Sequence, residues 1–82
     1  MATLFKAGDR VTYLGYEVGI RDGRTVVFDT RKRWKATVTR VGRETTPAGQ
    51  ELFVQVDADQ PGNSRAGMEH QVFARRDGVK AV

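Results

Sequence analysis

Short runs of alternating apolar and polar residues recur along the chain, and turn residues separate them. The runs are Asp9–Leu14, Arg24–Asp29, Trp34–Val41, Glu51–Ala58 and His70–Ala74. Glycine, proline and aspartate interrupt the pattern roughly every 8–12 residues, and no window shows the 3.6-residue apolar period of a helix. This pattern predicts an all-β fold, a small barrel of about five to six short antiparallel strands that forms one domain over residues 1–82.

The alternation also predicts which side chains point into the barrel. In the run 51–58 the inward set is Leu52, Val54, Val56 and Ala58. The same alternation places Phe53 on the opposite, polar face. In the run 34–41 it predicts that Trp34, Ala36 and Val38 face inward and that Lys35 faces outward.

Two turns are predicted from residue type. Asp22-Gly23 suits a tight hairpin that joins Ile20 to Thr25. The segment 46–49, Thr-Pro-Ala-Gly, suits a turn because proline fixes one φ angle and glycine accepts a positive one.

Basic residues are concentrated in one part of the chain. The 82 residues carry a formal net charge of +4, but residues 21–43 alone contain eight basic and two acidic residues. A concentrated positive field attracts polyanions, whereas the alternative interpretation is a solvated surface that keeps a small barrel soluble. The residues expected to bind nucleic acid or an acidic protein are Arg21, Arg24, Arg31, Lys32, Arg33, Lys35 and Arg43.

The composition also indicates the cellular compartment. The chain has no cysteine, its N-terminus lacks the apolar run of a signal peptide, and no segment approaches a membrane span. We therefore expect a cytoplasmic protein without a membrane partner.

Few residues offer catalytic chemistry. There is one histidine, His70, and one serine, Ser64, and nothing near them resembles a nucleophile elbow. The ligand count excludes structural zinc, and no phosphate-cradling glycine loop precedes a helix. We expect no catalytic residue, no metal and no cofactor.

The order of several short motifs is nevertheless informative. The opening Phe5-x-x-Gly8-Asp9-x-Val11 resembles the start of an SH3-like barrel. Together with Trp34, Thr46-Pro47-Ala48-Gly49, Pro61-Gly62 and His70-Gln71-Val72-Phe73, it resembles the plasmid-borne type II dihydrofolate reductases. This resemblance implies an SH3-like barrel that assembles as a tetramer around a central pore and reduces dihydrofolate with NADPH.

The departures from that family lie where its chemistry would be. The resemblance assigns the pore to Gln71, Val72 and Phe73, and only Gln71 keeps the polar pore residue of the family. Tyr13 stands in the position of the pore lysine, and Phe73 replaces a tyrosine. Because catalysis in that family rests on positioning, these changes weigh against reductase activity.

A structural interpretation of His70–Phe73 is a final barrel strand, with Val72 and Met68 inward and Gln71 and Phe73 outward. Trp34 is then a candidate for the core or for a subunit interface. Phe53 and Phe73, if exposed, are candidates for an interface in a homo-oligomer or with a partner. The sequence thus favours a small non-enzymatic binding module for nucleic acid or an acidic protein, of the kind found among phage or plasmid regulatory and assembly factors. The reductase is the alternative.

Overall fold

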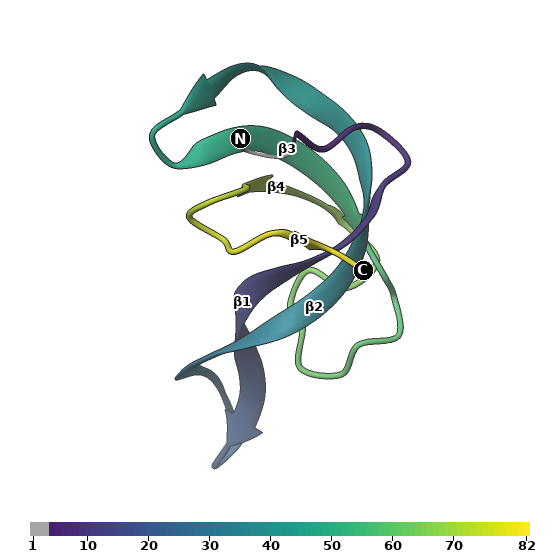
Figure 1. Cartoon of the computed structure of the whole chain (residues 1–82). Helices are drawn as coiled ribbons and strands as arrows, with labels where there is room; N and C mark the ends of the chain where they lie inside the picture. The colour runs from purple at the N-terminus through teal and green to yellow at the C-terminus, as the bar shows by residue number, and fades with distance from the viewer. Residues whose placement is uncertain (1–3) are drawn as a thin grey trace.

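The computed structural model describes residues 4–82, with all side chains in that range except those of Asp29 and Glu44; residues 1–3 of the predicted domain lie outside it. Five antiparallel strands form one sheet with the order β4-β3-β2-β1-β5. Their bounds are β1 Arg10–Arg21, β2 Arg24–Thr46, β3 Gly49–Val56, β4 Glu69–Phe73 and β5 Lys80–Ala81. The sheet curls on itself as a small open barrel (Figure 1), which confirms the all-β antiparallel class.

The sequence predicted that all strands are short, but one of them is long. The predicted runs 24–29 and 34–41 belong to one strand, β2, which is 23 residues long. No glycine or proline lies between the two runs, so the chain stays extended and keeps pairing with β1. The interruption is a bulge, where the pairing shifts register between Tyr16 and Val18.

The core is apolar and follows the predicted alternation. Its buried members are Val11, Tyr13, Trp34, Ala36, Val38, Leu52, Val54, Val56, Val72 and Val79. Phe5 packs against this cluster from the N-terminal end. Lys35 is exposed, as expected for its place between two inward residues.

Two inward predictions are wrong, and both concern strand ends. Ala58 is exposed because β3 ends at Val56 and the chain leaves the sheet there. Met68 is exposed because β4 begins only at Glu69, so the residue belongs to the preceding turn. Alternation assigns a face only while the backbone remains in the ladder.

The hairpin of β1 and β2 extends beyond the barrel as a two-stranded arm (Figure 1), and the molecule measures 46 × 23 × 20 Å. Asp22 and Gly23 form its tip, with φ angles of +52° and +76°. Two consecutive positive φ angles define a type I′ turn, which matches the twist of the strands, and Ile20 pairs with Thr25 as predicted. The turn at 46–49 is also confirmed, because Thr46 pairs with Gly49 there.

Candidate nucleic-acid interface

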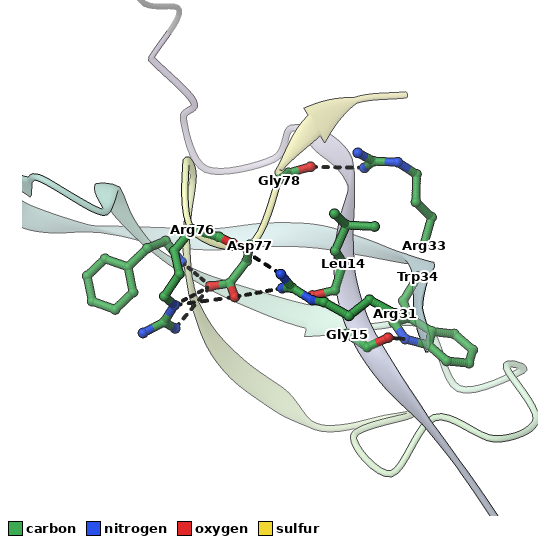
Figure 2. Close-up of polar contacts among 9 residues, drawn as sticks. Leu14, Gly15, Arg31, Arg33, Trp34, Arg76, Asp77 and Gly78 are labelled. Atoms are coloured by element: carbon green, nitrogen blue, oxygen red, sulfur yellow. Dashed lines mark hydrogen bonds and ion pairs between the residues drawn. The ribbon is translucent and has the colours of Figure 1, made fainter. Parts of the chain in front are cut away.

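The barrel closes where β5 and the segment between β4 and β5 meet the edge of β1 that faces away from β2, a junction we call the seam. The backbone N–H of Leu14 donates to the carbonyl of Asp77 at 2.7 Å, and β5 pairs with β1 through Val11 and Thr12. The Asp77 carboxylate lies at the centre of this junction (Figure 2), with 13% of its side chain exposed. It accepts the backbone N–H of Phe73 at 2.8 Å.

Two guanidinium groups share this carboxylate. Arg31 reaches it from β2 at 3.3 Å, and Arg76 reaches it from the adjacent position at 3.0 Å. Arg31 also donates to the Leu14 carbonyl at 2.8 Å, so its head group bridges β1 and the closing segment (Figure 2). Two cations against one anion leave this cluster with a net positive charge.

A row of cations runs along the outer face of β2 from this point. Trp34 and Ala36 point into the core, so the alternating residues Arg31, Arg33 and Lys35 point outward. Lys80 joins them, because Lys35 and Lys80 both pair with Thr12 in the neighbouring strand. We call Arg31, Arg33, Lys35 and Lys80 the outer row.

Most of the outer row lacks acidic partners. Arg33 donates to the Gly78 carbonyl and the Thr12 hydroxyl at 2.9 Å each, which holds its head group in place without neutralising it. Among the side chains that the structure describes, no carboxylate lies within 4 Å of Arg33, Lys35 or Lys80. The face therefore presents one guanidinium group held in place at Arg33 and two exposed ammonium groups, at Lys35 and Lys80, that are available to an anion.

The other predicted cations lie elsewhere. Lys32 belongs to the opposite face of β2, where its ammonium group lies 5.1 Å from the centre of the Trp34 ring. Arg21 and Arg24 pair with each other across the tip of the arm. Arg43 lies near the other end of β2, beyond a further bulge between Val38 and Arg40. The predicted set is thus spread along the length of the molecule, and only Arg31, Arg33 and Lys35 share one face.

The three residues predicted for an interface do not lie on one surface. Trp34 is 3% exposed and is a core residue, with its indole N–H donating to the Gly15 carbonyl at 3.0 Å. Phe53 and Phe73 point outward but are half-buried, and Arg40 and Arg76 lie over their rings at 3.7 and 4.6 Å.

Of the residues assigned to a pore by the reductase resemblance, Gln71 is exposed on β4. Val72 is fully buried in the core. Phe73 is the half-buried outward residue that Arg76 covers.

A side pocket of about 310 Å³ opens beside the seam. Tyr13, Trp34 and His70 line its inner part, and Tyr16, Val18 and Val27 of the arm form an apolar wall. The loop between β3 and β4 contributes Asn63, Ser64 and Arg65, while Arg31 and Asp77 lie at its rim. The pocket therefore combines aromatic and aliphatic surface with several hydrogen-bond donors.

Two titratable side chains in the pocket stay uncharged near neutral pH. Burial lowers the pKa of His70 below its ordinary value, and the positive charge of Arg65 lowers it further. Burial raises the pKa of Tyr13, whose hydroxyl accepts the Asn63 amide N–H at 3.2 Å. The two rings pack with their centres 5.7 Å apart.

Sequence reasoning missed three residues of this surface. Asp77 looked like a turn residue, Lys80 lay outside the basic segment, and Arg65 lay in a loop without a motif. Only the pairing of β5 with β1 and the return of the 57–68 loop bring them to the seam and the pocket. No local signal in the sequence reports those long-range contacts.

Comparisons of the chain with protein-family models, with curated proteins and with solved structures find no match. Within residues 4–82 no helix is long and apolar enough to cross a lipid bilayer. The described side chains contain no group of three histidine, aspartate or glutamate residues placed to hold a metal ion.

Proposed function

We propose that this protein binds nucleic acid through its phosphate backbone, using the outer row as the main contact surface. The observation that carries the proposal is the row itself, in which Arg33, Lys35 and Lys80 project from a convex sheet face without a described acidic partner. Alternate residues of a strand are about 6.6 Å apart, so Arg31, Arg33 and Lys35 are regularly spaced along β2, while Lys80 lies two strands away on β5. Phosphate contacts of this kind give affinity without reading base sequence.

The distribution of the remaining cations favours nucleic acid over an acidic protein. Arg24 lies at the tip of the arm and the outer row lies on the barrel, in a molecule 46 Å long. A compact acidic patch on a protein can meet only part of such a line of charge. A linear polyanion can follow all of it, which is why nucleic acid is the better match.

The experiment is a fluorescence anisotropy titration of labelled single-stranded and duplex oligonucleotides at low salt, repeated at increasing salt. The test variant is Arg33→Gln with Lys35→Gln, and the matched control is Arg43→Gln with Arg75→Gln, which removes the same charge from other places. We expect the row variant to bind more weakly. The slope of the logarithm of its binding constant against the logarithm of the salt concentration should become less steep by about 0.7–0.9 for each lost phosphate contact, while the control changes little.

Two results would contradict the proposal. Equal weakening by the two variants would mean that binding follows net charge and not the outer row. No binding at low salt, combined with binding of poly-glutamate, would assign the basic surface to acidic proteins. Circular dichroism and the midpoint of thermal unfolding establish that each variant is folded before its binding is compared.

A further inference from the structure

The side pocket lies at a gap in the closure of the barrel. Along the free edge of β1, the N–H of Leu14 donates to Asp77 and the N–H of Val18 donates to the Gly62 carbonyl, both at 2.7 Å. Between these two bonds the edge borders the pocket at Gly15 and Tyr16. The N–H groups of alternate strand residues point to the same side, so the N–H of Tyr16 points towards this opening.

The walls of the opening suit a flat, polar ring. Tyr16 is 53% exposed, and with Val18 and Val27 it provides apolar surface on the arm, with the Arg31 guanidinium 5.9 Å from the centre of the Tyr16 ring. The opposite side is polar. There the Tyr13 hydroxyl accepts a bond from Asn63, so its own proton remains available to an acceptor.

The imidazole of His70 adds both kinds of hydrogen-bonding group. Its lowered pKa keeps the ring neutral near pH 7, with one nitrogen that donates and one that accepts. Nucleobases carry both donors and acceptors on their edges and a π-face that stacks on aromatic side chains. The volume of about 310 Å³ is at the low end of small-ligand pockets, which range over about 300–1,000 Å³, and fits one base better than a larger ligand.

The outer row leads directly to this opening. Arg31 is the last member of the row on the side of the arm, and it also lines the pocket. Arg65 lies on the other side of the pocket, and no described carboxylate is within 4 Å of it. A strand whose phosphates follow the row would therefore reach the pocket with a second cation beyond it.

We infer that the side pocket receives one unpaired base of a nucleic-acid strand bound along the outer row, which makes single strands the preferred ligand. This inference rests on the proposed function and specifies its ligand. A paired base is held in its stack and presents no free face, so a duplex must lose a base pair to fill the pocket. A single strand has no such cost.

The binding test uses the variant Tyr16→Ser and the matched control Ile20→Ser, which changes another exposed apolar residue of β1 outside the pocket. We expect Tyr16→Ser to weaken single-strand binding by about 5- to 100-fold, the range of one base–aromatic stack. Duplex binding should stay within about twofold, and the control should change neither. Equal affinity of the original protein for both forms, with no effect of Tyr16→Ser, would overturn the inference and leave the proposed function standing.

A second measurement locates the base directly. The ring signals of His70 are followed by nuclear magnetic resonance while a single-stranded oligonucleotide or inorganic polyphosphate is added to the full chain. Both polyanions should bind the outer row, but only the oligonucleotide should shift the His70 signals, because polyphosphate has no bases. Equal shifts with both ligands would mean that the pocket binds phosphate, and no shift with a bound oligonucleotide would leave the pocket outside the complex; either result overturns the inference. Failure of both ligands to bind at all would instead overturn the proposed function.

Discussion

Single side chains, more than strand pairing, hold the seam together. The segment between β4 and β5 meets β1 with few backbone hydrogen bonds, and β5 is only two residues long. The carboxylate of Asp77 compensates by binding three groups, the N–H of Phe73 and the guanidinium group of Arg76 in its own segment and that of Arg31 in β2. Removing a mostly buried carboxylate that several groups share lowers the stability of the fold, because its partners are left without their hydrogen-bond acceptor.

We therefore expect Asp77→Asn to lower the free energy of unfolding by about 1–3 kcal/mol, the cost of breaking hydrogen bonds to a charged and mostly buried group. Urea unfolding monitored by tryptophan fluorescence measures this, since Trp34 is a core residue. The control is Asp59→Asn, which changes an exposed carboxylate and should have an effect within about 0.5 kcal/mol. Equal effects of the two substitutions would mean that the seam does not depend on this carboxylate.

The state of His70 predicts how stability changes with pH. Its pKa in the folded chain is below the ordinary value of about 6.5, so the unfolded chain binds more protons in the range between the two values. Stability is therefore greatest above about pH 7 and decreases as the pH falls below about 6.5 towards the lowered pKa of the folded chain.

The measurement is the unfolding midpoint at a series of pH values in that range, for the original protein and for His70→Gln. Because His70 is the single histidine of the chain, the variant should lose most of the slope. An unchanged slope in the variant would assign the pH dependence to carboxylates. Those groups titrate mainly below this range, and the pKa of Asp57, for example, is lowered by its bonds to Arg10.

At the scale of the strands, the alternation of apolar and polar residues predicted most of the side chains that point into the core. The inward faces of the runs 34–38 and 52–56 were correct because each run stays in the ladder and repeats every second residue. The continuity of β2 was not predicted, since residues 30–33 carry no periodic signal and the bulge opposite Glu17 has no local signature. Bulges depend on both strands of a pair, and one strand read alone does not reveal them.

The arm depends on its tip, because beyond the bulge its two strands pair mainly with each other. Gly23 has a φ of +76°, which residues with a Cβ atom adopt only at a cost. We expect Gly23→Ala to increase amide hydrogen exchange in residues 18–27 severalfold and to leave exchange in the core unchanged. Increased exchange throughout the chain would show instead that the arm and the barrel unfold as one unit.

At the scale of the whole molecule, the arrangement of charge is the property that sequence could least predict. The sequence located the basic segment correctly but could not tell which cations share a face. That depends on the three register shifts in the pairing of β2 and on the place of Lys80, which lies across β1 from Lys35. The side pocket could not be predicted from the sequence either, because its walls come from β1, β2, β4 and a loop. Both features depend on long-range pairing, whereas the elongated shape of the molecule comes from the arm, a local hairpin.

This shape allows a test of whether one ligand contacts the arm and the outer row together. Arg24 and Lys35 are eleven positions apart on β2, up to about 36 Å at the rise of a fully extended strand. A long single strand can reach both, whereas a short one can cover only part of that distance. We therefore expect Arg21→Gln with Arg24→Gln to weaken binding of an oligonucleotide of about 16 nucleotides and to flatten its salt dependence by about 1.4, since each lost phosphate contact contributes about 0.7.

The same variant should bind an oligonucleotide of about 4 nucleotides as the original protein does, because that ligand is held by the row and the pocket alone. The control with Arg43→Gln and Arg75→Gln has the same net charge. It distinguishes the loss of a direct contact between the arm and the ligand from the effect of a lower net positive charge. Equal weakening for both lengths would show that the tip acts only through its long-range field. No weakening for either length would show that the bound strand does not extend along the arm, and the contact surface would then be confined to the barrel.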